Sequence, residues 1–275
     1  MASRFHFRGS AIGAAGRISS PFSEIIEVQA ASALPQIGGH GTARSVAFKH
    51  REILQFHLAH TEVTGTPCDC DDDDDPVSHN SRITSTVEGL NILGMITAVR
   101  VVATLASTYT PASDGEPSVR LIGTRFENLR IAGIPVEVDL AADVFDQFDT
   151  HRALSHAYKT NDAVRGLVDQ LTLKHRAKEA PPHIMRWLNP IESGSELPSS
   201  RGITSISLVR GLAPRGGGLD CWGHVIHVPG FGTIRLAELE ISKTTRTVNM
   251  IQVDIDCPHK AQLMLCSVSD GGEDY

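Results

Sequence analysis

The chain has 275 residues, of which 41% are apolar and 24 are glycine, the proportions of a folded globular protein with one or two domains. This length excludes a miniprotein that depends on disulfides for its stability. Lysine and arginine number 25 against 32 aspartates and glutamates, a net charge of −7, so neither nucleic acid nor an anionic membrane is expected as a partner.

Much of the negative charge lies in one segment. Six aspartates fall between residues 69 and 75, and without them the 32 acidic residues become 26, against 25 basic ones. We predict an Asp-rich loop at residues 64–81. An EF-hand alignment of this run places Asp74 where glycine is required and Asn80 where the bidentate glutamate belongs. No calcium loop is therefore expected.

The cysteines do not form a metal motif. There is no C-x-x-C pair and no histidine beside a cysteine pair at zinc-finger spacing. Because the count is odd as well, we expect reduced thiols at Cys68, Cys70, Cys221, Cys257 and Cys266.

No segment has the pattern of a secretory leader or a membrane span. The basic residues 1–8 precede a stretch, 9–16, that is too short and too rich in small residues for a signal peptide. The most apolar stretch, 92–106, contains Arg100 and is shorter than the roughly 20 residues that cross a bilayer. With reduced thiols, these features predict a cytoplasmic location.

Most of the chain alternates with the period of two that is typical of β-strands. Val99 and Val101 are predicted to share the core face of one strand, with Arg100 on the other face. Pro135 cannot donate a backbone hydrogen bond, so its strand should lie at a sheet edge or begin pairing after this residue. Predicted strands cover residues 25–28, 54–59, 99–106, 134–140 and 203–209.

The C-terminal third predicts a three-stranded antiparallel meander over residues 225–228, 233–241 and 248–255. In the second of these strands, every second residue is apolar up to Leu236, and the alternation then resumes one residue out of step at Leu239. A similar jump occurs in the third strand, between Met250 and Ile251. Such jumps indicate β-bulges or a strong local twist.

Residues 142–188 have a helical period instead. Asn161 is a candidate helix N-cap, and a short further helix would contain Ile184, Trp187 and Leu188. The residues at helical spacing, predicted to face the core, are Phe145, Phe148, Leu154, Tyr158, Val164, Leu167, Val168 and Leu171.

The sequence therefore predicts a single, mainly β domain over residues 1–275. Its core is an antiparallel sandwich or a barrel-like sheet of about eight to ten strands. A helical insertion at residues 142–188 and the Asp-rich loop at 64–81 interrupt this core.

Four segments have the order and character of a known family. They are Gly9–Pro21, Ser85–Ala98, Leu129–Val136 and Val228–Glu238, the last continued by Thr247–Val253 and the strand Ala261–Ser269. In these segments the chain resembles the bacterial choice-of-anchor P proteins, where a small-residue opening, a GL-x-x-LGG-like strand, a G-x-PV strand and a PG-x-G-T-V-x-L-x-E hairpin recur. The resemblance implies a β-rich, ectodomain-like module without assigned catalytic residues. It makes an extracellular location the alternative to the cytoplasm.

Three histidine pairs have spacings that merit a test as metal ligands. Residues three apart on a strand point to opposite faces, and residues five apart on a helix also diverge. No metal site is therefore predicted at His57 and His60, at His224 and His227, or at His151 and His156.

Sequence motifs for covalent catalysis and for cofactor binding are missing. There is no G-x-S-x-G elbow, and no cysteine has the basic setting that lowers a thiol pKa. The glycine-rich runs 38–41 and 216–218 match neither phosphate-binding pattern. No catalytic residue and no cofactor is therefore assigned.

Two further features of the C-terminal third have a functional and a structural interpretation. Glu238 and Glu240 flank Leu239, and two carboxylates can hydrolyse glycosides, but a solvated strand face explains this spacing better. Trp222 could line a ligand pocket, although packing in the core is favoured.

Two functions follow as hypotheses. The first is a non-catalytic binding or structural module, because no nucleophile, base and orienting group converge. The alternative is an enzyme or small-ligand carrier with a pocket between the sheet and the inserted helices. The partner would be an unidentified protein or small molecule, and self-association through an exposed strand edge is also open.

Overall fold

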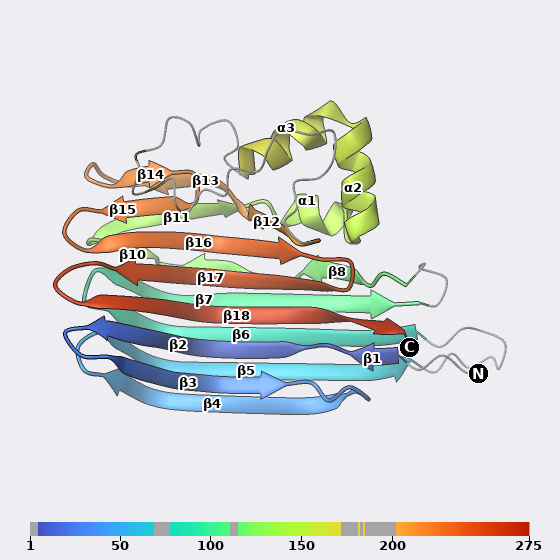
Figure 1. Ribbon diagram of the computed structural model, residues 1–275, viewed down its shortest axis with the longest axis horizontal. Coiled ribbons are helices and arrows are strands. Elements are labelled where there is room, and N and C mark those ends of the chain that lie inside the picture. Colours follow the sequence, from blue (N-terminus) through green and yellow to red (C-terminus); the bar gives the residue numbers. More distant parts are fainter. Residues whose placement is uncertain are drawn as a thin grey trace.

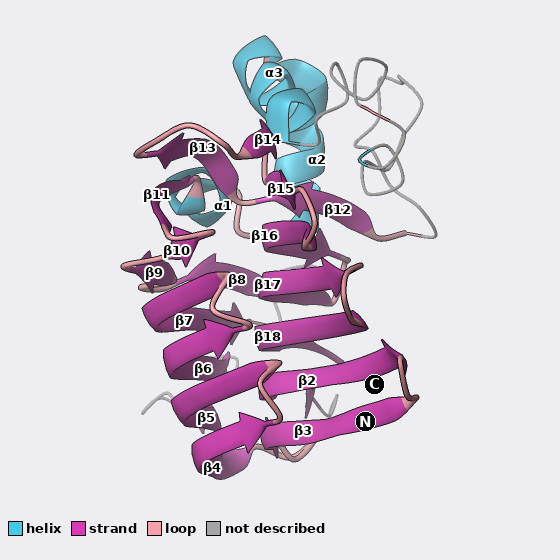
Figure 2. Cartoon of the chain, turned by 90° about the vertical axis from the view of Figure 1, so that its left-hand side faces the viewer, coloured by secondary structure: helices cyan, strands magenta, loops and turns pink. Residues whose placement is uncertain are grey.

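The computed structural model describes residues 5–68, 78–110, 115–171 and 202–274, and the single residues 181 and 184. In these ranges it is a sandwich of two nine-stranded antiparallel sheets with three short helices (Figure 1). The sheets lie face to face and meet at β3 and β4, while the helices lie toward the opposite edge (Figure 2). The mainly β fold is confirmed, and of the two predicted forms the structure is the sandwich.

The first sheet has the strand order β14-β15-β16-β17-β18-β2-β3, with β1 paired to β18 and β12 paired to β16. Its strands are β1 (Phe5–Phe7), β2 (Ser10–Ser20), β3 (Glu24–Ala33), β12 (Thr204–Ser207), β14 (Asp220–Trp222), β15 (Val225–Val228), β16 (Gly232–Ile241), β17 (Thr245–Ile255) and β18 (Lys260–Asp274). The predicted C-terminal meander is confirmed as β15, β16 and β17.

The second sheet has the order β13-β11-β10-β7-β6-β5-β4, with β8 and β9 paired to β7. Its strands are β4 (Gly39–His50), β5 (Leu54–Cys68), β6 (Ser78–Ile92), β7 (Ile96–Tyr109), β8 (Ser118–Leu121), β9 (Arg125–Glu127), β10 (Arg130–Ile131), β11 (Ile134–Leu140) and β13 (Val209–Pro214). The prediction for Pro135 is wrong, because β11 lies between β13 and β10 and already pairs with β10 at Ile134 and Pro135. Only its pairing with β13 begins after Pro135, at Val136.

The predicted Asp-rich loop at 64–81 is too long. Strand β5 continues to Cys68 and pairs it with Ser78 of β6. The polar side chains here belong to strands with one solvated face, because Val63 and Ile83 on the other face are fully buried. The aspartates at 69–75 lie outside the described residues.

Five strands contain one residue in the left-handed backbone conformation, away from any turn. On β16, the pairs Leu236–Ile251 and Glu238–Asn249 keep the same register, while Ala237 between them leaves the ladder. The strand pleat inverts at this point, so Leu236 and Leu239 are both fully buried, which explains the predicted phase jump. The five residues, with φ values, are Ala30 (51°), Ala47 (52°), Gly89 (64°), Ala237 (49°) and Cys266 (55°).

The inversion overturns one prediction about β7. Val99 lies opposite Gly89, between the pairs Glu88–Arg100 and Leu90–Ala98. Its side chain is 56% exposed, whereas Val101 is fully buried. The two valines therefore do not share a face. The alternation of inward and outward side chains, on which the prediction rested, shifts by one residue opposite Gly89.

We expect Ala47→Gly to stabilise the protein by about 1 kcal/mol, since glycine removes the penalty of a Cβ in the left-handed region. Ala43→Gly, the same change on the same strand at a position without positive φ, should destabilise by a similar amount. Gly89→Ala should also destabilise, because the new Cβ would lie 2.4 Å from Nδ1 of His57. Urea unfolding measures all three, and a loss of stability in Ala47→Gly would contradict the assignment.

A buried carboxyl group joins the two sheets. Asp270 on β18 is fully buried and accepts hydrogen bonds from Ser81 Oγ of β6 at 2.6 Å and from the Gly271 amide at 2.8 Å. Ser81 Oγ also lies 2.6 Å from Ser107 Oγ. Burial raises the pKa of Asp270 to about 7, although the hydrogen bonds of Ser81, Gly271 and Ser107 act in the opposite direction.

The raised pKa of Asp270 predicts a fall in stability between about pH 4 and pH 7. In that range the folded state holds a proton that the unfolded state has released, so the free energy of unfolding decreases as pH rises. We expect Asp270→Asn to remove this slope, which amounts to a few kcal/mol, whereas Asp139→Asn at an exposed carboxyl should retain it. Urea titrations from pH 4 to pH 8 measure the difference, and parallel curves for wild type and Asp270→Asn would contradict the prediction.

The helical insertion is confirmed over residues 142–171. It contains α1 (Ala142–Gln147), α2 (His151–Thr160) and α3 (Asp162–Leu171), and none of them is long or apolar enough to span a bilayer. Asn161 caps α3 as predicted, since its Oδ1 accepts hydrogen bonds from the Ala163 and Val164 amides at 3.0 and 3.3 Å. The predicted short helix at 184–188 lies outside the described residues except for Ile184, which is buried.

A buried arginine fastens the insertion to the first sheet. Arg246 of β17 is 2% exposed and donates to the carbonyl oxygens of Phe145 at 3.0 Å and Phe148 at 2.5 Å, at the C-terminal end of α1. A cation is favourable there because the last carbonyls of a helix lack intrahelical partners. Burial lowers the pKa of Arg246 to about 10, opposed by Asp149, Asp146 and Glu116, so the side chain remains charged at neutral pH.

We expect Arg246→Met to destabilise the protein by about 3–5 kcal/mol, because two carbonyls and nearby carboxylates lose a buried cation. Arg120→Met is the control, since Arg120 contacts Asp149 of the same insertion but is 61% exposed, where an ion pair contributes under about 1 kcal/mol. Urea unfolding followed by circular dichroism measures both, and equal effects would contradict the assigned role.

Candidate ligand pocket

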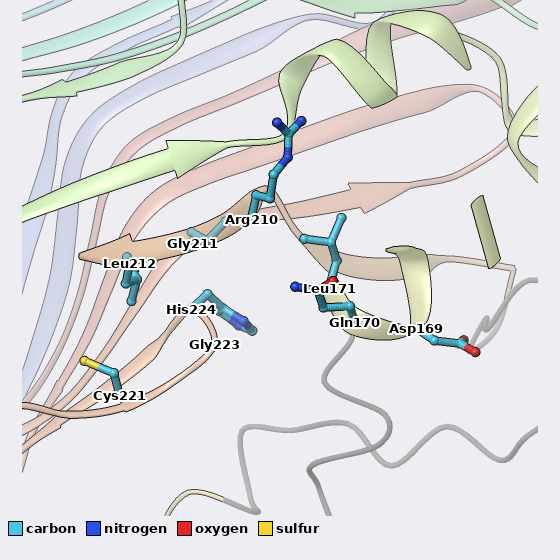
Figure 3. A pocket seen from close by; sticks show the side chains of 10 residues that line it. Asp169, Gln170, Leu171, Arg210, Gly211, Leu212, Cys221, Gly223 and His224 are labelled. Atoms are coloured by element: carbon cyan, nitrogen blue, oxygen red, sulfur yellow. The ribbon is translucent and has the colours of Figure 1, made fainter. Parts of the chain in front are cut away.

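A cavity of about 360 Å³ lies where the helical insertion meets the sheets, a volume within the range of small-molecule sites. Its walls come from the end of α3, from β13 and from the β14–β15 hairpin (Figure 3). We call it the α3 pocket. It is lined by Asp169, Gln170, Leu171, Val209, Arg210, Gly211, Leu212, Cys221, Gly223 and His224.

The hairpin turn positions the histidine of this pocket. Trp222 pairs with Val225, which leaves Gly223 and His224 as a two-residue turn. Gly223 has φ of 59°, a conformation that glycine adopts without penalty. The carbonyl of His224 accepts a hydrogen bond from the Leu236 amide at 3.1 Å, and this bond holds the turn against β16.

A carboxylate beneath the turn orients the imidazole. His224 Nε2 lies 3.4 Å from Glu238 Oε1, and Arg235 Nη1 donates to both oxygens of Glu238 at 3.1 and 3.0 Å. Gln252 Nε2 donates to Glu238 Oε2 at 2.7 Å. Burial by itself raises the pKa of Glu238, but the His224 hydrogen bond and the charges of Arg235 and His224 outweigh it and leave this pKa below its usual value. Glu238 is therefore ionised at neutral pH.

The pleat inversion at Ala237 creates this arrangement. Arg235 and Glu238 are three residues apart and would lie on opposite faces of a regular strand. Because the backbone of Ala237, which lies between them, is in the left-handed conformation, both side chains lie on one face and form an ion pair. The prediction that Glu238 lies on a solvated strand face is therefore wrong, since its side chain is only 21% exposed.

The second nitrogen of the imidazole is buried without a partner. The side chain of His224 is 9% exposed, and its Nδ1 has no hydrogen-bond partner among the described residues. An unsatisfied buried polar atom costs about 1–3 kcal/mol. The Nδ1 atom of His224 is therefore an unsatisfied polar atom enclosed by the protein.

Two charged residues, Arg210 and Asp169, are among the described lining residues, and both are already held by other groups. Arg210 pairs with Asp143 of α1 and lies 3.9 Å from Asp139, and its guanidinium points away from His224 in Figure 3. Asp169 Oδ1 accepts a hydrogen bond from Tyr158 Oη at 2.8 Å. The other described lining residues are polar but neutral, or apolar.

Cys221 lines the pocket as a neutral thiol. Burial, and then the charge of Asp220, raise the pKa of its thiol, which opposes the thiolate that a nucleophile requires. Among the described residues no hydrogen bond joins Cys221 to His224, and the two side chains point in different directions in Figure 3. Cys221, Cys257 and Cys266 are free thiols.

The predicted histidine pairs have separate outcomes. His224 lies in a turn and not on a strand, so the alternation argument does not apply to its separation from His227. The argument fails for His57 and His60 too, because the pleat of β5 changes phase between the buried Phe56 and Ala59. Within the described ranges, no three His, Cys, Asp or Glu side chains group as a metal site requires.

Sequence reasoning named Trp222 as a possible pocket residue and missed its neighbours Cys221 and His224. Trp222 donates from Nε1 to Asp220 Oδ1 at 2.9 Å and is half-buried. The signal that could have found the site is the apolar phase jump from Leu236 to Leu239. A jump there requires Arg235 and Glu238 to share the opposite face, directly below the hairpin that carries His224.

Residues 5–242 match the family model described as a domain of unknown function, DUF8256. The chain belongs to this family. The match includes the helical insertion and every residue that lines the α3 pocket. No curated protein and no solved structure matches the chain, so any function for this member of the family has to be argued from the pocket itself.

Proposed function

We propose that this protein is a non-catalytic module that binds a small molecule in the α3 pocket. The observation that supports the proposal is the cavity of about 360 Å³ between α3 and the β14–β15 hairpin. Its described lining mixes the aliphatic side chains of Leu171, Val209 and Leu212 with polar ones such as Gln170 and His224, so a ligand that is partly apolar and partly polar would match it. The proposal takes the non-catalytic binding role from the first hypothesis. It takes the position of the pocket, between the sheet and the inserted helices, from the alternative hypothesis.

A binding role is favoured over an enzymatic one by the chemistry of the lining. The Glu238–His224 pair resembles the orienting half of a catalytic triad, but the third member is missing. Cys221 is a neutral thiol without a hydrogen bond to His224, and no serine or threonine is among the described lining residues. Among the described lining residues, an ester or peptide substrate would find no activated nucleophile.

The resemblance to the choice-of-anchor P proteins stays a prediction, and it fits a binding role because it implies no catalytic residues. The location in the cytoplasm, with the extracellular alternative, also stays a prediction. So does self-association through a strand edge, for which the terminal strands β14 and β13, away from the junction of β3 and β4, are the candidates.

The pocket can be filled without disturbing the fold. Gly211 lines the pocket, has no positive φ, and a Cβ there would meet no atom within 4 Å. We expect Gly211→Phe to weaken the binding of phenol and toluene at least tenfold, since the new ring occupies the cavity. The measurement is saturation-transfer NMR with each compound, titrated against the full chain.

Gly217→Phe is the matched control, because Gly217 also has open space around its Cβ and no positive φ but lies outside the pocket. It should bind both compounds as wild type does. If wild type bound neither compound, or if both variants lost binding equally, the α3 pocket would not be the binding site.

A further inference from the structure

We infer that the outer face of the second sheet carries a further binding site, separate from the α3 pocket, for the phosphate or carboxylate group of a small molecule. Its basis is an open groove of about 470 Å³ on this face, which we call the arginine groove. The groove is lined by Arg44, Leu58, His60, Thr86, Glu88, Arg100, Val102 and Arg125.

The strand register brings these residues together. Residues directly opposite one another in an antiparallel ladder point to the same face of the sheet. One row of opposite residues crosses β4, β5, β6, β7 and β9 and consists of Arg44, His60, Thr86, Val102 and Arg125. The next row contains Leu58, Glu88 and Arg100. Among the described elements, the helices lie toward the far edge of the sandwich and leave this part of the face uncovered (Figure 2).

The groove concentrates positive charge on a chain whose net charge is −7. Three guanidinium groups and one carboxylate are among its described lining residues. Arg100 Nε donates to Glu88 Oε1 at 2.9 Å. Glu127, beside the groove, accepts a hydrogen bond from Arg125 Nε at 2.7 Å and lies 3.6 Å from Arg100 Nη1. With Glu127 included, three cations face two carboxylates, and the cation without a carboxylate partner is Arg44.

The arginines keep donors that the described part of the protein does not use. The exposed Arg44 side chain forms no ion pair and no hydrogen bond with the described residues. Arg100 donates from Nε, and Arg125 donates from Nε and from Nη1, the latter to the Gly123 carbonyl at 2.9 Å. A guanidinium presents its N–H donors as a planar fork that matches two oxygens of a carboxylate or phosphate. The remaining donors therefore suit an oxyanion.

The floor of the groove is neutral, so the acidic group of a ligand should decide its affinity. Leu58, Thr86 and Val102 lie between the arginines, and the Thr86 hydroxyl can donate to or accept from the body of a ligand. Apart from the imidazole of His60, no ring is among the described lining residues, so stacking on a neutral sugar or base contributes little. The net charge of −7 opposes a polyanion, which favours a small molecule.

The test compares three probes with one shared scaffold: glucose 6-phosphate, glucuronate and neutral glucose. NMR titration of the full chain, followed through the backbone amide signals, measures both the affinity and the place of binding. We expect the two anions to shift the amides of His60, Thr86 and Val102, and to bind at least about fivefold more tightly than glucose. Their binding should weaken as sodium chloride is added, because salt screens exposed charges.

Arg44→Gln should weaken both anions about fivefold, because it removes the guanidinium that no carboxylate neutralises. Arg17→Gln is the matched control, since Arg17 of β2 is also exposed and forms no ion pair among the described residues, but lies on the other sheet. It changes the net charge equally and should bind both anions as wild type does. Glu88→Gln should strengthen their binding, because it removes a lining carboxylate and releases Arg100 Nε.

Equal losses in Arg44→Gln and Arg17→Gln would overturn the inference in favour of attraction by overall charge. Binding of glucose as tight as that of the anions would overturn it too, as would no anion binding or amide shifts only outside the groove. Binding of one anion alone would support it and assign the ligand group as phosphate or as carboxylate. The phenol and toluene titrations at the α3 pocket test the proposed function separately, so either can fail without the other.

Discussion

The inversion of the strand pleat is the constraint on which the rest of this structure depends. In five strands one residue has the left-handed backbone conformation, and the residues on either side of it pair with the neighbouring strand in the same register. Four of these five residues are not glycine. Each non-glycine residue in this conformation costs about 1–2 kcal/mol. On β16 the cost is offset because both halves of the strand keep an apolar face toward the other sheet, where Leu236 and Leu239 are buried. On β7, opposite Gly89, Ala98 and Val101 are buried in the same way.

The same inversion builds the polar side of the pocket. It brings Arg235 and Glu238 onto one face of β16, where a regular strand would separate them. Glu238 in turn orients His224 from below. A backbone feature that first serves the packing of the core thus positions an ion pair and an imidazole beside the β14–β15 hairpin, and the chemistry of the pocket follows from it.

The helical insertion supplies the opposite wall of the pocket, and its attachment is electrostatic as well as apolar. Arg246 binds the carbonyls at the end of α1, while Glu116 Oε2 accepts a hydrogen bond from the Arg152 amide in the first turn of α2 at 2.8 Å. These contacts link the insertion to β17 and to the segment before β8. They hold α1 and α2 in place, and α3, which follows α2 after Asn161, forms one side of the cavity.

The sequence by itself determined the mainly β class, the C-terminal meander, the helical block and the Asn161 cap, because these depend on local periodicity and local hydrogen bonding. It also contained the phase jump between Leu236 and Leu239. Only the tertiary structure decided which side chains this jump brings together. The partners of Glu238 and Arg246 depend on which strands and helices meet in space. Periodicity assigns a side chain to a face. It cannot assign that side chain a neighbour from another element, and the roles of His224, Asp270 and Arg246 all depend on such neighbours.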